Sequence, residues 1–212
     1  MTMLLCSQYE PMPLTENELF LFKTYFPEDK ELEAVTLQEL SDNTNGLKVD
    51  WTSIRHDGDG LLEGSELTCG VNIGFVVFDC ICLFIGAVSL RSSLSKSTAE
   101  LVGKAAEPVM SQLEEYIRII GNADSSKSEV GQAVFNVVAT IYSGGCLGAV
   151  ISAFCTGLTT YQYILYGATA VGTITAACAT DGVAIIGAIL VELATVGFLT
   201  VDAISCVKEC DF

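Results

Sequence analysis

The sequence has little positive charge. Only 10 Lys and Arg residues stand against 26 Asp and Glu residues in 212, and the formal net charge is −16. A surface this acidic repels the phosphates of nucleic acids, so we expect no nucleic acid among the partners. The few bases are also unevenly spread, because residues 128–207 contain no Lys or Arg at all. Such a gap is unusual for a surface that faces water.

Histidine and the motifs of common enzymes are also scarce. The one His is His56, so a Ser–His or Cys–His pair has a single candidate base. The sequence contains no Gly-x-Ser-x-Gly, no phosphate-binding Gly-x4-Gly-Lys-Ser/Thr, no His-Glu-x2-His and no dinucleotide-binding pattern. We therefore predict that the protein is not an enzyme.

Apolar residues are abundant instead. They make up 50% of the chain, charged residues make up 17%, and the mean hydropathy is +0.49. A surplus of this size is typical of helices that lie in lipid. We predict an all-α fold in two parts. The first is an acidic head at residues 1–69, and the second is a helical membrane domain at residues 70–212.

Four apolar segments of the second part are long enough to span a membrane. They lie near residues 71–90, 132–156, 161–180 and 182–205. The last three are rich in Gly, Ala, Ser and Thr, and Gly144 and Gly148 have the small-xxx-small spacing that lets helices pack closely in lipid. A bundle whose apolar helices are buried entirely by protein is the rival interpretation.

Residues 97–120 are predicted to form an amphipathic helix that lies either on the bundle or on the bilayer surface. Its apolar positions recur at every fourth residue, at Leu101, Ala105, Val109, Leu113 and Ile117. Pro108 is expected to kink or restart this helix. Ser126 and Glu129 have capping-box spacing and predict the start of another helix.

Two acidic residues, Asp79 and Glu192, lie near the middle of predicted spans. Acids in lipid are costly and normally face the interior of a bundle or a water-filled path. We expect these two either to be hydrogen-bonded inside the bundle or to line a path for cations or protons.

Four spans would place both termini on one side of the membrane. The loop 91–130 carries 5 Lys and Arg, so the positive-inside rule assigns it to the cytosol and the head and carboxyl terminus to the other side. Five of the nine cysteines lie in apolar runs and are predicted to be reduced, namely Cys80, Cys82, Cys146, Cys155 and Cys178. The other four are Cys6, Cys69, Cys206 and Cys210. They can pair on an oxidising side of the membrane, where a Cys69–Cys206 bridge is geometrically possible.

Residues 51–67, WTSIRHDGDGLLEGSEL, contain four acids and three glycines. With Gly60 at the sixth position of a loop, oxygen ligands fall at its third, fifth, seventh, ninth and twelfth positions. These are Asp57, Asp59, the Leu61 carbonyl, Glu63 and Glu66. The segment resembles an EF-hand, whose loop binds Ca²⁺ through these positions, and the resemblance implies a calcium site. Arg55 stands at the first position, where the family has Asp, and this weakens the implied site.

EF-hands occur in pairs, and residues 21–40 resemble a degenerate partner hand that ends at Glu39. Two expectations follow from the resemblance, a weak calcium site or a hand that holds no metal and serves the structure only. The helix that leaves the loop leads directly into the predicted span at residue 71, so a calcium-linked movement would reach a membrane helix.

From these patterns we predict a small integral membrane subunit with a structural or regulatory role in a larger membrane complex. Its expected partners are lipids and other membrane proteins. Two alternatives are open. One is a pore-forming protein that inserts apolar helical hairpins, and the other is a cation or proton channel that uses the intramembrane acids.

Overall fold

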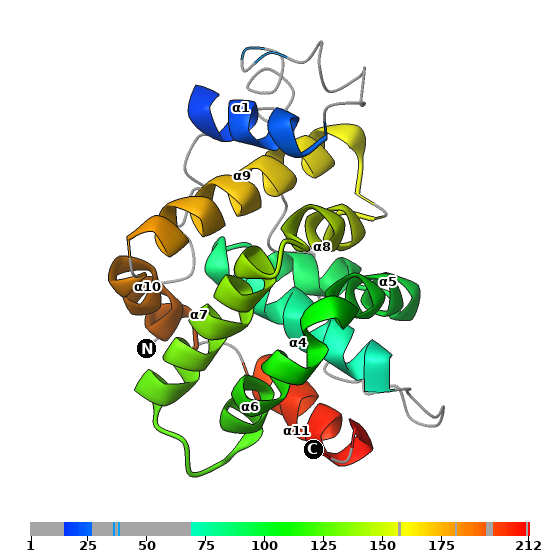
Figure 1. Ribbon diagram of the computed structural model, residues 1–212, viewed down its shortest axis with the longest axis vertical. Coiled ribbons are helices and arrows are strands. Elements are labelled where there is room, and N and C mark those ends of the chain that lie inside the picture. The colour runs from blue at the N-terminus through cyan, green and yellow to red at the C-terminus, as the bar shows by residue number, and fades with distance from the viewer. Residues whose placement is uncertain are drawn as a thin grey trace, which may run out of the picture.

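The computed structural model describes residues 15–26, 36, 38, 69–156, 158–180, 182–193, 197–210 and 212. Every regular element in this part of the chain is a helix (Figure 1). The all-α prediction is therefore confirmed for the described residues. The EF-hand-like segment 51–67 lies outside them, as do residues 27–35 of the expected partner hand.

Helix α4 (Cys69–Phe84) runs through the middle of the molecule (Figure 1). It packs against α5 (Lys96–Ala106), α7 (Lys127–Ser143) and α11 (Phe198–Cys210). It packs more lightly against α9 (Thr160–Ala179) and α10 (Val183–Leu193). Every residue from Val71 to Phe84 is buried. A helix that is apolar on all sides is stable only where its neighbours cover all of it.

The length of α4 falls short of a bilayer. Its 16 residues rise about 24 Å, against about 30 Å for the hydrocarbon core of a membrane. Among the described residues, no single helix has both the length and the apolar composition of a span. Helix α7 and the following α8 (Leu147–Phe154) have them only together, across a bend of 116°.

The segment expected as the first span contains two helices. After α4 the chain turns at Gly86, whose φ of 67° suits glycine because no Cβ interferes there. The 3-10 helix η1 (Val88–Ser93) then runs on from this turn. Arg91 of η1 is thereby brought back toward α4.

The predicted amphipathic helix consists of two helices. Helix α5 is followed by a 3-10 turn, η2 (Glu107–Val109), and then by α6 (Met110–Gly121). Pro108 lies inside the turn, where it interrupts the α-helical hydrogen bonds. The apolar stripe is correct in α6, where Leu113 and Ile117 are fully buried. It is wrong in α5, because Leu101 is 43% exposed.

The size of the side chains explains why α5 turns a different face inward. Ala99 and Gly103 of α5 lie against Gly70 and Gly74 of α4. A Cβ on Gly74 would collide with the carbonyl of Ala99, and a Cβ on Gly103 would collide with the carbonyl of Gly70. The two backbones therefore touch, as in the small-xxx-small packing of membrane helices. The larger Leu101 is turned outward.

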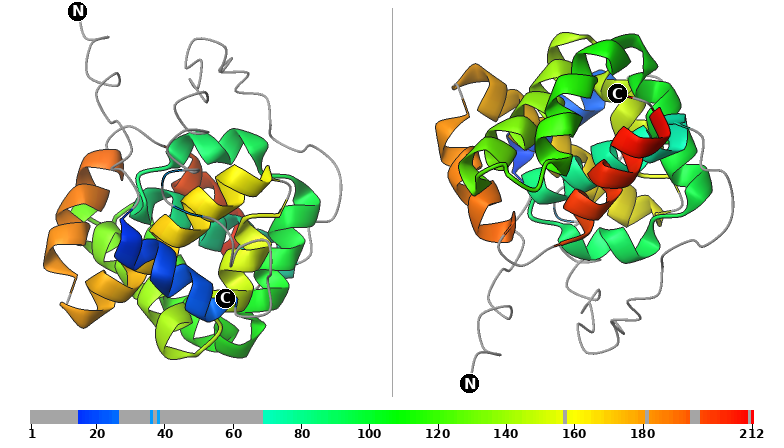
Figure 2. Two further views of the ribbon diagram at one scale, coloured as in Figure 1. Left: turned by 90° about the horizontal axis from the view of Figure 1, so that it is seen from above. Right: turned by 90° about the horizontal axis from the view of Figure 1, so that it is seen from below.

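Three more helices belong to the described part of the chain. Helix α1 (Glu16–Tyr25) packs on α9 (Thr160–Ala179) at the end opposite to α11, and α10 (Val183–Leu193) packs on α7 (Figure 2). The predicted start at Ser126 is confirmed, because its side chain accepts a hydrogen bond from the backbone N–H of Glu129 and caps α7.

Candidate functional site at the contact of α4 and α11

The contact between α4 and α11 combines an apolar stripe with charged and sulfur-bearing side chains. Leu199, Ala203 and Cys206 of α11 are 0% exposed, and their spacing of four and three residues puts them on one face of the helix. We call this contact the α4–α11 seam. Its polar residues are Cys69, Asp79, Arg91, Asp202, Cys206 and Cys210.

One cation joins two acids in the seam. The Nη2 atom of Arg91 donates a hydrogen bond to Oδ2 of Asp202 at 2.6 Å. The Nε atom of Arg91 lies 3.0 Å from Oδ1 of Asp79, but its N–H does not point at that oxygen, so this contact is an ion pair without a hydrogen bond. The guanidinium also lies 5.0 Å from the centre of the Phe75 ring and 5.8 Å from that of Phe198, within cation–π range.

Asp79 is the most confined of these groups, since its side chain is 0% exposed while those of Arg91 and Asp202 are 24% and 20% exposed. Burial raises the pKa of the Asp79 carboxyl well above its usual value, Arg91 opposes the rise, and Asp202 adds to it. The cluster has one cation for two carboxyl groups, so a proton on Asp79 would leave it without net charge.

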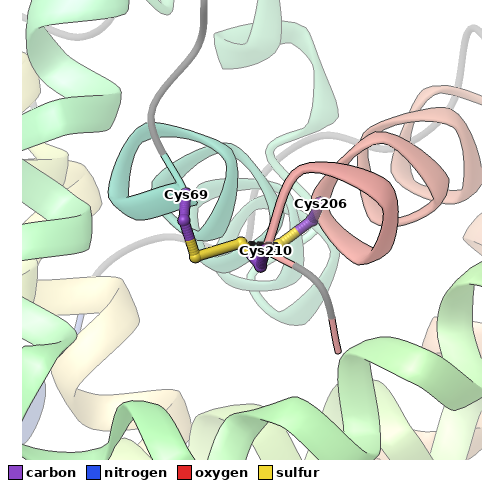
Figure 3. The surroundings of a disulfide bond; sticks show 3 residues. All are labelled: Cys69, Cys206 and Cys210. Atoms are coloured by element: carbon purple, nitrogen blue, oxygen red, sulfur yellow. Dashed lines mark hydrogen bonds between the residues drawn. A yellow bond between two sulfur atoms is a disulfide. The ribbon is translucent and has the colours of Figure 1, made fainter.

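A disulfide ties the same two helices at the other end of the seam. Cys69, the first residue of α4, is bonded to Cys210, the last residue of α11, with their Cα atoms 4.8 Å apart. Cys206 is a free thiol one helical turn before Cys210, and their sulfurs are 3.7 Å apart (Figure 3). The sequence left the pairing open, with Cys69–Cys206 as one geometrically possible bridge, and the structure has Cys69 bonded to Cys210.

The free thiol is strongly held in its neutral form. Burial raises the pKa of Cys206 to about 12, and the nearby carboxylate of Asp202 adds to the rise. The cysteines predicted to be reduced are free thiols in the structure as well, with Cys178 half-buried and the other four buried. Cys6 lies outside the described residues.

Only part of the predicted site falls within the described residues. The calcium ligands proposed at residues 57–66 lie outside the described residues, and so does the side chain of Glu192. Asp79 is among the described residues, and it is paired with Arg91, which the sequence analysis placed in the loop 91–130. The described residues contain no group of three or more His, Cys, Asp or Glu side chains placed to hold a metal ion.

Comparison with known proteins gives no template for this site. The chain matches no protein-family model, no curated protein and no solved structure. An open groove between α6, α7 and α9 is bordered by Tyr116, Asn136, Thr140 and Cys178 among others, and none of its lining residues is an acid, a His, a Lys or an Arg. The seam is where a buried acid, its cation and a disulfide come together, and the function is argued from it.

Proposed function

We propose that the protein is a membrane-inserting protein of the pore-forming kind, which keeps an apolar helix covered in its folded form and releases it into lipid. The observation that carries this proposal is the burial of α4, from Val71 to Phe84, inside a layer of other helices. One of these, α5, turns the exposed and charged Glu100 and Lys104 outward. A helix that is apolar on all sides is stable either inside a protein or inside a bilayer, so α4 can exchange one environment for the other.

The covered segments have the dimensions that insertion needs. Helix α4 with part of the turn after it approaches the roughly 20 residues of a membrane-spanning helix. The segment from α7 to α8 is long and apolar enough once its bend at residues 144–146 opens. The close contact of α4 with α5 uses small residues, which pack as well in lipid as in water.

In this proposal the α4–α11 seam prevents α4 from leaving the folded protein. Insertion of α4 alone requires that its disulfide to α11 be cut or exchanged and that Asp79 separate from Arg91. A charged carboxylate at the centre of a bilayer costs about 2.5–3.5 kcal/mol or more. The folded form is therefore held closed until the seam opens.

A second candidate, the membrane subunit, is favoured by the outward face of α10. Val183 is 70% exposed, and Ala184, Gly187 and Ala188 beside it are exposed as well. No charged residue occurs between positions 182 and 191. Such a face suits lipid or the apolar surface of another membrane protein.

Two further features of the proposal concern the head and its surroundings. The Cys69–Cys210 disulfide supports a location of these residues outside the cytosol, because such bonds persist in oxidising compartments. In a calcium-rich compartment of that kind, even a weak EF-hand-like loop would be filled and would stabilise the head.

Vesicle leakage tests the proposal directly. Purified protein is added to phosphatidylcholine vesicles loaded with a dye, before and after reduction of the disulfide, and bound protein is separated by flotation. Uncharged vesicles are chosen because the net charge of −16 opposes binding to anionic lipid. We expect reduced protein to float with the vesicles and to release the dye.

Extraction from the native membrane, together with the leakage assay, separates the candidates. A subunit would be extracted from its native membrane only by detergent and would co-purify with other chains, without releasing dye. Absence of both flotation and leakage for oxidised and reduced protein would refute membrane insertion.

A further inference from the structure

Three cysteine sulfurs meet at one end of the seam. The sulfurs of Cys69 and Cys210 are bonded, and the Cys206 sulfur lies 3.7 Å from that of Cys210 (Figure 3). Figure 3 shows the three sulfurs in the order Cys69, Cys210, Cys206. A thiolate in contact with a disulfide sulfur is the arrangement from which thiol–disulfide exchange proceeds.

We propose that this cluster is an internal thiol–disulfide exchange site. In the exchange, the Cys206 sulfur replaces the Cys69 sulfur as the disulfide partner of Cys210. The Cys206 thiolate attacks the Cys210 sulfur, a Cys206–Cys210 bond forms, and the Cys69–Cys210 bond breaks. The electron pair of the broken bond leaves with the Cys69 sulfur, which takes up a proton equivalent to the one lost by Cys206. The step needs no oxidant and no reductant.

The consequence is a change in what the disulfide joins. Before exchange it connects positions 141 residues apart and fixes the start of α4 to the end of α11. After exchange it connects two positions of α11 that are one turn apart. The start of α4 is then free of covalent restraint, although the chain remains as oxidised as before.

Helix geometry keeps the exchange in check while α11 is intact. The Cβ atoms of residues four apart on a helix are about 5–6 Å from each other, whereas a disulfide needs about 3.5–4.5 Å. The last turn of α11 must therefore unwind before a Cys206–Cys210 bond can close. Because Cys210 is the last residue of this helix, only its terminal turn has to yield.

Burial provides the second check. With a pKa of about 12, Cys206 is almost entirely a protonated thiol at neutral pH. Once the seam opens and water reaches this thiol, its pKa falls toward the ordinary value of about 8.5. The fraction of reactive thiolate then rises by about three orders of magnitude. Opening of the seam and exchange of the disulfide therefore promote each other.

The inference does not depend on membrane insertion, and disulfide mapping tests it without lipid. The intact protein is incubated without reductant at pH 7 to 10, alone and in urea below its unfolding transition. It is then quenched with acid, labelled with a maleimide and digested for mass spectrometry. We expect the label to move from Cys206 to Cys69 and a Cys206–Cys210 peptide to appear. The rate should rise about tenfold per pH unit, as the thiolate fraction does.

The matched control is C206S, with C206A as a second variant should the serine disturb folding. Either variant removes the attacking sulfur and should leave Cys69 unlabelled and bonded to Cys210 under the same conditions. Two results would overturn the inference. One is a wild-type protein that keeps the Cys69–Cys210 bond throughout, and the other is equal release of Cys69 in the variants.

Discussion

Removal of the Arg91 side-chain charge should destabilise the protein strongly. The substitution R91M keeps an unbranched apolar stem beside Phe75 and Phe198 but leaves Asp79 buried without a cation. Loss of one partner of a buried ion pair costs about 3–5 kcal/mol, because the remaining charge stays desolvated. This is a large share of the roughly 5–15 kcal/mol by which folded domains are stable.

The loss should depend on pH in a defined direction. Arg91 lowers the pKa of Asp79, so R91M raises it further and leaves the carboxyl easier to protonate. A neutral carboxyl needs no cation, so the difference in stability between R91M and the wild type should shrink as pH falls from 8 to 5. The pair D79N with R91M, which removes the charge together with its partner, should recover most of the loss.

Urea unfolding followed by circular dichroism measures these differences. The control is R118M, because Arg118 is an exposed residue of α6 and its substitution should change stability by no more than about 0.5 kcal/mol. If R91M lost no more than R118M, or lost the same amount at pH 5 and pH 8, the seam would not be held by a buried charge.

Three further predictions follow from the packing, the disulfide and the head. The substitution G103V should lower the free energy of unfolding in urea by about 3 kcal/mol or more, because its side chain collides with the α4 backbone. G187A is the control and should raise the free energy of unfolding by about 0.5–1 kcal/mol, since nothing lies near Gly187. Replacement of Cys69 and Cys210 by Ser should lower the unfolding free energy by about 3–5 kcal/mol, because their bond closes a very long loop; an unchanged unfolding curve would show that the bond does not form. Calorimetry on the full chain should detect millimolar calcium binding that E66Q abolishes, and equal heats for both proteins would remove the calcium site.

Local sequence patterns predicted local structure well. Ser126 and Glu129 are only three residues apart along the chain, and the helix start they predict is present. The sequence also predicted a break in the helix at Pro108, because proline has no N–H to donate, and a 3-10 turn is present there. Periodicity failed in α5, because a fourfold repeat identifies large apolar residues and the contact with α4 selects the smallest ones.

The seam could not be read from the sequence for a different reason. Arg91 and Asp202 are 111 residues apart, and Cys69 and Cys210 are 141 apart. No local rule relates such positions, because their contact depends on how every helix between them packs. The sequence did mark Asp79 as an unusual acid in an apolar segment, and that part of the site was predictable.

The central claim is that α4 leaves its protein surroundings for lipid, and fluorescence quenching by brominated acyl chains tests it. The one native Trp is removed by W51F. F78W then reports from the buried helix α4, and Y116W reports from α6 as a control. With reduced protein and brominated phosphatidylcholine vesicles, we expect strong quenching for F78W and weak quenching for Y116W. Vesicle-bound protein in which F78W is no more quenched than Y116W would contradict the account.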